Sequence, residues 1–232
     1  MSDYRIPDDM RAWAETARGR LHLWDAFAGS RTALVVVDMQ NYFVAPSFLG
    51  ECKAARAIVP TVNRLGQAVR EAGGRVVWIA NTSSDTEESW SVRHAFESPE
   101  RSRSRLDQMR LGTEGCEIWR ELDVRPEDGR LFKTRYSACL QGSSELPSFL
   151  RENGLDTVLI AGTYTNVCCQ TSAQDAMMLN FQTVMVSDCC AGSSPEAHAA
   201  ALTNFFRFFG DVLTADEVVE RLRRTGTEAA AA

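Results

Sequence analysis

Six short apolar runs recur along the chain, and longer segments with a helical pattern of apolar residues separate them. Several runs are apolar at consecutive positions and rich in β-branched residues, which is typical of strands buried on both faces of a parallel sheet. Because strands and helices alternate, the pattern predicts a three-layer α/β/α sandwich around a mostly parallel, six-stranded sheet. The strands are expected at Ala33–Val37, Arg75–Asn81, Gly129–Lys133, Thr157–Ala161, Thr183–Ser187 and Asp211–Leu213.

Capping residues and glycines mark where the helices between these strands begin and end. A helix with Pro60 in its first turn is expected to end at Gly73 and Gly74, and a later helix is expected to end at Gly154. The other helices are expected at Glu114–Leu122, Ser144–Asn153, Val167–Asn180, Pro195–Phe209 and Ala215–Arg224.

Three stretches lie outside this alternation. Residues 1–30 are polar and partly amphipathic, which favours an N-terminal helical arm that packs on the domain or on a partner subunit. Residues 82–128 are rich in Ser, Glu and Arg, and an excursion of this length is typical of a lid, a substrate loop or a subunit contact, with a solvated insertion as the alternative. Residues 226–232 are expected to be a disordered tail, so residues 31–225 form a single predicted domain.

Composition narrows the class of protein. The chain has 232 residues, of which 44% are hydrophobic, so one sizeable core can form without disulfides or metal. A net charge of −6 makes nucleic acid and anionic membrane poor partners. No apolar run approaches the ~20 residues of a membrane helix, and charged residues interrupt the apolar stretches of the first 30 residues, unlike a signal peptide. We therefore expect a cytoplasmic enzyme.

Three polar residues stand at or just beyond the ends of predicted strands, namely Asp38, Lys133 and Cys168. In a parallel sheet these ends share one edge, which is where ligands bind. A thiol needs a proton acceptor or a positive field to become a nucleophile at neutral pH. Asp38 can take the proton, and Lys133 can hold the pair together. Lys133 is one of only two lysines among 25 basic residues, which favours a role that arginine does not fill.

The segment around Cys168 joins a strand to a helix through the turn Gly-Thr-Tyr-Thr-Asn, which places Cys168 in the first helical turn. There the helix dipole and free N–H groups stabilise a thiolate, and nearby N–H groups can bind an oxyanion. These parts suit acyl transfer through a thioester. The seven cysteines include two adjacent pairs and no CxxC, which favours neither a disulfide framework nor a structural zinc site.

Other chemistries of α/β proteins fit the sequence less well. No GxGxxG follows a strand, and no GxSxG elbow is present. The stretch DMQNY offers no second carboxylate that would hold Mg²⁺ beside Asp38. His22, His94 and His198 lie away from the predicted strand ends, and we interpret them as surface or packing residues.

Three motifs, VVVDMQNYF, FKTRYSA and GTYTNVCCQTSAQDA, resemble in their order and spacing the isochorismatase-like cysteine hydrolases, roughly over residues 30–215. The resemblance implies that family's six-stranded parallel sheet and its Asp–Lys–Cys triad. Asp38 then corresponds to the general base, Lys133 to the triad lysine, and Cys168, which directly follows T-N-V, to the nucleophile. It further implies a cis peptide bond at Thr163–Tyr164 and an oxyanion hole formed by the N–H groups of Tyr164 and Cys168.

The resemblance also narrows the reaction. The branch that hydrolyses isochorismate lacks the nucleophilic cysteine, and nicotinamidases carry an Asp–His–His metal site where this chain reads NTSSDTEESW. We therefore predict no metal and no other cofactor. The nearest pattern is similar to ureidoacrylate and other carbamoyl amidohydrolases. This implies a small amide or ureido substrate, cleavage of its C–N bond through a thioester, release of ammonia, and a homodimer or homotetramer.

The sequence departs from the family's common TNVCVES pattern at Cys169 and Gln170, and Tyr164 is larger than the residue usual at its position. We expect Cys169 to face the buried side of its helix, with a role as oxidation partner of Cys168 as the alternative. Tyr164 is expected to narrow the pocket or to change its preference.

Candidates for substrate binding lie near strand ends or in the 82–128 segment. Arg135, or an arginine from residues 93–110, is suited to binding a substrate carboxylate, with a solvated position as the alternative. For each aromatic candidate a core or interface position is an equally good interpretation, and Asn81 also suits a turn cap. The other candidates are Phe43, Trp78, Asn81, Trp90 and Tyr136.

Two alternatives to the amidohydrolase stay open at this point. One is a vinyl-ether or ester hydrolase of the same fold, which needs Asp38 but not the thiol. The other is a non-catalytic member, which the complete set of polar residues at strand ends disfavours, because burying them without a use is costly.

Overall fold

The computed structural model describes residues 4–230, and its centre is a six-stranded sheet in the order β3-β2-β1-β4-β5-β6. All neighbouring strands pair in parallel, so the predicted α/β sheet is confirmed and is entirely rather than mostly parallel. The strands are β1 (Thr32–Val37), β2 (Arg75–Asn81), β3 (Gly129–Lys133), β4 (Thr157–Thr163), β5 (Gln182–Ala191) and β6 (Asp211–Leu213).

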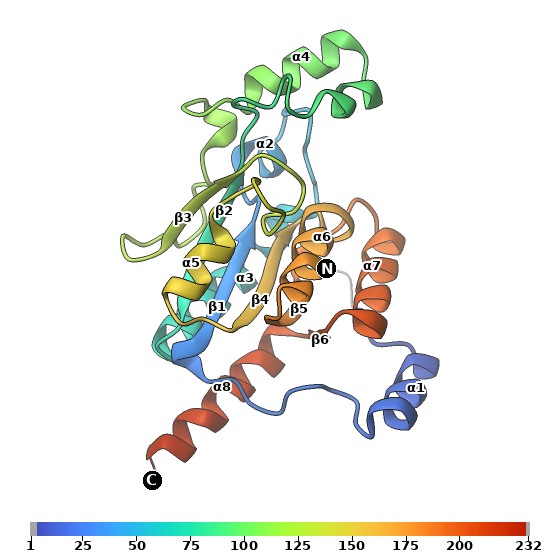
Figure 1. Ribbon diagram of the computed structural model, residues 1–232, viewed down its shortest axis with the longest axis vertical. Helices are drawn as coiled ribbons and strands as arrows, with labels where there is room; N and C mark the ends of the chain where they lie inside the picture. The colour runs from blue at the N-terminus through green and yellow to red at the C-terminus, as the bar shows by residue number, and fades with distance from the viewer. Residues whose placement is uncertain (1–3, 231–232) are drawn as a thin grey trace.

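Helices cover both faces of this sheet (Figure 1). Strand β1 explains why both faces must be covered, because Leu34 and Val36 belong to one buried cluster while Val35 and Val37 belong to the other. The first cluster packs against α3 (Ala55–Glu71) and α8 (Ala215–Ala230). The second packs against α5 (Leu146–Glu152), α6 (Gln170–Met178) and α7 (Pro195–Phe208). The result is the three-layer sandwich that the alternation predicted.

The register of the central strands sets where a site can form. Val37 pairs with Ile79 of β2 and with Gly162 of β4, and Lys133 pairs with the last residue of β2. The carboxyl ends of four strands therefore meet at one edge. Gly162 has φ +114°, and a Cβ built there would lie 2.0 Å from the carbonyl oxygen of Val37, so only glycine permits this approach of β4 to β1.

The N-terminal segment contains α1 (Asp8–Arg18), which packs on α7 of the same chain. The guanidinium group of Arg18 lies 4.8 Å from the ring centroids of both Trp13 and Phe206. Tyr4 adds a hydrogen bond of 3.2 Å between its hydroxyl and that of Thr203. A short 3-10 helix, η1 (Gly29–Arg31), then leads into β1.

Residues 82–128 form an irregular segment, and its part around the helix α4 (Pro99–Gln108) lies beyond the carboxyl ends of the strands (Figure 1). It contains the 3-10 helix η2 (Ser91–Phe96), the helix α4 (Pro99–Gln108) and the 3-10 helix η3 (Glu114–Cys116). The sequence pattern did not predict α4, which has a strongly polar sequence. Its start has a clear local cause, because the Ser98 hydroxyl accepts a hydrogen bond from the N–H of Arg101, and Pro99 occupies the first helical position.

The helix expected at Glu114–Leu122 is wrong, since helical structure there ends at Cys116. The backbone that follows pairs with the chain beyond β1 instead. The N–H of Trp119 donates to the carbonyl oxygen of Met39, and Ile118 forms an isolated antiparallel bridge with Gln40. These tertiary hydrogen bonds satisfy the backbone in place of helical ones.

Two further details differ from the expectations. Pro60 lies in the interior of α3 rather than in its first turn, because the helix begins earlier, at Ala55. Helix α8 runs on to Ala230, so residues 226–230 of the expected disordered tail are helical, in keeping with the high helix propensity of alanine. Residues 231–232 of that tail lie outside the described residues. Over the described chain, no helix is both long and apolar enough to cross a membrane.

Candidate active site

Strand geometry brings Asp38 and Lys133 into direct contact. Asp38 follows β1 in a left-handed backbone conformation (φ +55°), and Lys133 is the last residue of β3, two strands away. The Lys133 side chain crosses the end of β2, so that its Nζ lies 2.8 Å from Oδ2 of Asp38, and both side chains are completely buried. Nζ also donates a 3.0 Å hydrogen bond to the carbonyl oxygen of Arg135.

Cys168 completes this group from β4. The strand is followed by the short segment η4 (Thr165–Cys169), which has π-helical hydrogen bonding and leads directly into α6. The Cys168 thiol lies close enough to Asp38 and Lys133 for both charges to act on its pKa. The three residues that the sequence placed at one sheet edge are therefore brought close together.

The electrostatics of this group are set by burial and by mutual attraction. Burial raises the pKa of Asp38, and the ammonium group of Lys133 opposes this shift only in part. Burial opposes the charge on Lys133, but attraction to Asp38 and Cys168 raises the Lys133 pKa above its ordinary value. Burial also raises the pKa of the Cys168 thiol strongly, although the Lys133 ammonium favours the thiolate. At rest the cysteine is thus a protonated thiol beside a carboxylate with increased affinity for protons.

Gln40 is a buried residue of the site that sequence reasoning missed. Its Nε2 donates to the carbonyl oxygens of Asn81 (3.0 Å) and Gly115 (2.9 Å), and its Oε1 accepts a 2.6 Å hydrogen bond from the N–H of Asn81. Gln40 therefore ties the chain after β1 to the end of β2 and to the 82–128 segment. Its place two residues after Asp38, within the motif VVVDMQNYF, was the one signal in the sequence.

A cavity of about 230 Å³ contains Cys168 in its lining. Two edge-to-face aromatic pairs line the cavity. The ring centroids lie 6.0 Å apart for Phe43 and Tyr164 and 4.9 Å apart for Trp90 and Tyr136. Four of the candidate substrate contacts, together with Tyr164, line this cavity: Phe43, Asn81, Trp90 and Tyr136.

Two candidates are placed elsewhere. Arg135 does not line the cavity, because its guanidinium lies 5.2 Å from the ring of Trp90 and donates to the carbonyl oxygen of Ser89. The structure therefore places Arg135 behind Trp90 and outside the lining of the cavity, and its contact with a substrate carboxylate stays a prediction. Three arginines of the 93–110 stretch line the cavity instead: Arg93, Arg101 and Arg105.

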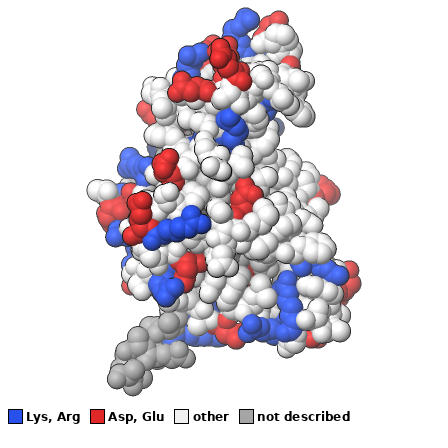
Figure 2. All heavy atoms as spheres, in the orientation of Figure 1, with Lys and Arg blue, Asp and Glu red and all other residues white. Residues whose placement is uncertain are grey.

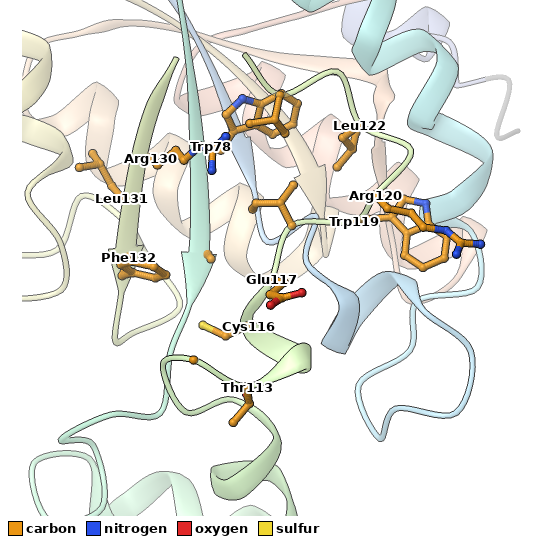
Figure 3. Close-up of a pocket in the computed structure, with 14 residues that line it drawn as sticks. Trp78, Thr113, Cys116, Glu117, Trp119, Arg120, Leu122, Arg130, Leu131 and Phe132 are labelled. Atoms are coloured by element: carbon orange, nitrogen blue, oxygen red, sulfur yellow. The ribbon is translucent and has the colours of Figure 1, made fainter. Parts of the chain in front are cut away.

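Trp78 also points away from Cys168. Its indole Nε1 donates a 2.8 Å hydrogen bond to Asp128. The ring lines a separate cavity of about 520 Å³ that residues of β2, β3 and the 112–124 stretch enclose, with Arg130 next to Trp78 (Figure 3). Of the two interpretations of Trp78, the structure therefore supports a core position rather than a wall of the cavity beside Cys168, since its side chain lies on the α3 side of the sheet.

Tyr164 directly precedes the η4 segment that contains Cys168. The Thr163–Tyr164 peptide bond is cis, as the family resemblance implied. The carbonyl oxygen of Tyr164 accepts hydrogen bonds from the N–H groups of Val167 and Cys169, which closes the η4 turn. Its phenol donates a 2.8 Å hydrogen bond to the carbonyl oxygen of Gly50, and this contact fixes the ring against the cavity.

Cys169 and His198 lie in buried packing positions. Cys169 is completely buried beside Cys190 and faces away from the cavity, as expected. None of the seven cysteines forms a disulfide in the described chain. His198 is buried, with Nδ1 2.8 Å from the Thr165 hydroxyl, and burial lowers its pKa to about 4. Within the residues that the structure describes, no group of three or more His, Cys, Asp or Glu side chains is arranged to hold a metal ion.

Comparison with known proteins agrees with this geometry. A model of the isochorismatase domain matches residues 32–217. A protein of Arabidopsis thaliana described as a probable inactive nicotinamidase is 32% identical over 173 residues, which cover 73% of this chain and 85% of that protein. A ureidoacrylate amidohydrolase of Caulobacter vibrioides is 30% identical over 199 residues, covering 79% of this chain and 87% of that protein.

A solved structure is similar as well. The crystal structure of a cysteine hydrolase from Pseudomonas syringae pv. phaseolicola superposes with a TM-score of 0.79 at 26% identity, covering 88% of this chain and 97% of that one. The parallel sheet and these similarities define a hydrolase with a three-layer α/β/α fold. The chain belongs to the isochorismatase family.

Proposed function

We propose that this protein is a cysteine-dependent amidohydrolase that cleaves a C–N bond of a small amide, ureido or carbamoyl compound and releases ammonia. The observation that carries the proposal is that Cys168, which lines a small cavity, lies near enough to the buried Asp38–Lys133 ion pair for both charges to act on its thiol. The similarity to a ureidoacrylate amidohydrolase supports the same reaction class.

In the proposed reaction, Asp38 accepts the proton of the Cys168 thiol as Sγ attacks the carbonyl carbon of the substrate. The raised pKa of Asp38 suits it to this role, and the ammonium of Lys133 stabilises the thiolate as it forms. Negative charge then develops on the carbonyl oxygen, and the N–H groups of Tyr164 and Cys168 donate hydrogen bonds to that oxygen.

Collapse of this intermediate breaks the C–N bond. Asp38 returns its proton to the departing nitrogen, which leaves as ammonia, and the acyl or carbamoyl group stays on Sγ as a thioester. Water then attacks the thioester carbonyl and gives up a proton to Asp38. The product leaves as an acid or a carbamate, the proton returns to Sγ, and the free thiol is restored.

The aromatic walls suit a small planar group. Amide and ureido groups are flat, and the rings of Phe43 and Trp90 can pack on their faces. A cavity of about 230 Å³ is smaller than the ~300 Å³ at which pockets for drug-sized ligands begin. Small substrates therefore fit the proposal better than large ones.

A screen of small amides and ureido compounds for ammonia release tests this function. Wild-type protein should release ammonia from part of the panel, while Cys168→Ala should release none above background and Asp38→Asn should be severely impaired. Turnover by Cys168→Ala at the wild-type rate would overturn the cysteine mechanism. If Asp38→Asn alone abolished turnover, the result would favour the hydrolase of vinyl ethers or esters instead.

The remaining expectations stay predictions. They are the absence of a metal or other cofactor, a cytoplasmic location, and a homodimer or homotetramer. Light scattering of the purified protein measures the last of these, and a monomeric mass would contradict it. The single-domain division at residues 31–225 also stays a prediction.

A further inference from the structure

Tyr164 borders two cavities. One is the cavity of about 230 Å³ that contains Cys168 in its lining, and we call it the Cys168 cavity. The other has a volume of about 730 Å³ and lies at the start of α7, and we call it the α7 cavity. Among the described residues, Tyr164 is the one that lines both. Removal of its ring is therefore expected to join the two cavities.

The Tyr164 side chain is close to groups of both cavities. Its ring packs edge-to-face on Phe43, which lines the Cys168 cavity. Burial raises the pKa of the Tyr164 phenol to about 12, and electrostatic interactions with Cys52 and Cys168 act in the same direction. Cys52 lines the α7 cavity, while Cys168 lines the other. The phenol therefore lies between the two cavities.

Hydrogen bonds and tight packing fix the ring in this place. The Tyr164 hydroxyl donates a 2.8 Å hydrogen bond to the carbonyl oxygen of Gly50. Gly50 itself packs closely, since a Cβ built there would lie 2.2 Å from the ring of Tyr42. The N–H of Cys52 donates a 2.8 Å hydrogen bond to the carbonyl oxygen of Phe43, which holds the same stretch of backbone. The ring is thus a fixed wall.

The α7 cavity suits an unbranched apolar chain. Glu51 and Lys53 are the charged residues of its lining and have opposite signs. His198 also lines it and stays neutral near pH 7, because burial lowers its pKa to about 4. The space-filling view shows few charged side chains over α7 (Figure 2). Its small or apolar lining residues are Cys52, Ala54, Ala57, Ile58, Cys190, Ala191, Gly192 and Pro195.

We infer that Tyr164 determines the length of the substrate, because its ring closes the Cys168 cavity against the α7 cavity. The group attached to the substrate carbonyl then has to be short enough to fit within about 230 Å³. With a small residue at position 164, an aliphatic chain would extend from the carbonyl beside Cys168 into the α7 cavity. This inference rests on the proposed function, because it limits the acyl part of the same substrate.

The alternative is that Tyr164 only packs against its neighbours. Its contacts with Phe43 and Gly50 would then contribute to stability alone. A packing role predicts that loss of the ring lowers the free energy of unfolding and leaves the range of substrates unchanged. A wall between the cavities predicts a change in that range.

A series of unbranched primary amides, from acetamide to octanamide, tests the inference. Wild-type kcat/KM should fall sharply at the chain length that reaches the ring. In Tyr164→Ala, each methylene group beyond that length should instead raise kcat/KM by about 4-fold, the size expected from burial of one methylene group. For acetamide the same variant should change kcat/KM by less than about 10-fold, the size of a lost aromatic contact.

Three other variants complete this test. Tyr164→Phe keeps the ring and should keep the wild-type length limit. Tyr164→Leu should also extend the range, and it replaces Tyr164→Ala if that variant does not fold. Ala57→Phe fills the α7 cavity from an exposed position on α3. It should change no amide by more than about 2-fold on its own, but in Tyr164→Ala it should lower kcat/KM for octanamide by about 10-fold or more.

Two results would overturn the inference. One is the same length limit in the wild type, Tyr164→Ala and Tyr164→Leu. The other is a gain for long amides that Ala57→Phe does not reduce, because the chain would then lie outside the α7 cavity.

Thiol labelling separates this inference from the proposed function, since it needs no turnover. The probes are N-alkyl iodoacetamides with methyl to heptyl chains, whose iodide the Cys168 sulfur displaces, and mass spectrometry of the peptides measures the rate at Cys168. The ratio of the heptyl to the methyl rate should be at least about 10-fold higher in Tyr164→Ala than in the wild type. An equal ratio, or no labelling of Cys168 by any probe, would overturn the inference.

The two proposals fail in different ways. If Cys168→Ala keeps full turnover while the labelling ratio still depends on Tyr164, the cysteine mechanism fails and the length limit stands. If turnover needs Cys168 but neither the amide range nor the labelling ratio depends on Tyr164, the length limit fails and the amidohydrolase stands.

Discussion

Removing the ammonium of Lys133 should destabilise the fold far more than removing the other lysine of the chain. Nζ of Lys133 lies 2.8 Å from Oδ2 of Asp38, and at an effective dielectric constant of ~20 this distance corresponds to an attraction of about 6 kcal/mol. Most of that attraction only offsets the loss of hydration of two completely buried charges. Lys133→Met leaves the carboxylate without its partner, so the free energy of unfolding should fall by about 3–5 kcal/mol.

A second substitution, Asp38→Asn, should recover part of this loss of stability. Asp38→Asn/Lys133→Met has neither charge, and its free energy of unfolding should exceed that of Lys133→Met by about 2 kcal/mol or more, because no uncompensated charge is buried. Lys53→Met is the matched control, since Lys53 is exposed, and should shift stability by less than about 0.5 kcal/mol.

Urea unfolding followed by circular dichroism at pH 7 measures the free energies of unfolding of the wild type and the three variants. The same measurement at lower pH tests the direction of the Asp38 pKa shift. Burial raises the folded-state pKa of Asp38, and Lys133→Met removes the charge that opposes this shift. A carboxyl whose folded pKa is raised binds more protons in the folded state, so the variant should become more stable, relative to wild type, as pH falls from 8 to 5. A loss below about 1 kcal/mol for Lys133→Met, or a double variant no more stable than Lys133→Met, would refute the reasoning.

One pH profile and two further substitutions have outcomes fixed by the structure. In the proposed mechanism Asp38 acts in its ionised form, and burial raises its pKa. The value of kcat/KM should therefore fall with decreasing pH, with a midpoint above ~4, the ordinary pKa of aspartate. A midpoint at or below ~4 would contradict this role. Gln40→Leu leaves the N–H and carbonyl groups of Asn81 and the carbonyl of Gly115 unpaired, so thermal or urea unfolding should show a loss of about 2–4 kcal/mol; a loss near zero would mean that water replaces the amide. Gly162→Ala forces a Cβ to within 2.0 Å of the carbonyl oxygen of Val37 at a positive φ, so the variant should lose more than about 3 kcal/mol or fail to fold, and a variant of wild-type melting temperature would contradict the close approach of β1 and β4.

The sheet was predictable because its strands carry a strong local signal. The run Ala33–Val37 is apolar at every position, and only a strand covered on both faces buries all of it. Once the strands are parallel, their carboxyl ends must meet, which is why Asp38, Lys133 and Cys168 could be grouped before any coordinates were known.

The outer part of the site could not be predicted, since its conformation depends on contacts between distant segments. Trp119 hydrogen-bonds to Met39 instead of continuing a helix, and Gln40 is held by groups from two other segments. Arg135 and Arg93 have the same side chain and similar polar neighbours in sequence. Only the fold shows that Arg135 lies behind Trp90 while Arg93 lines the cavity.

The covalent state of Cys168 during turnover tests the central claim most directly. Wild-type protein mixed with a substrate from the ammonia-release screen, quenched in acid within milliseconds and digested, should yield a peptide containing Cys168 heavier by the mass of the substrate minus ammonia. The same digest should leave Cys169, its neighbour in the buried core, unmodified. An adduct on Cys169 or on any residue other than Cys168 would contradict the mechanism.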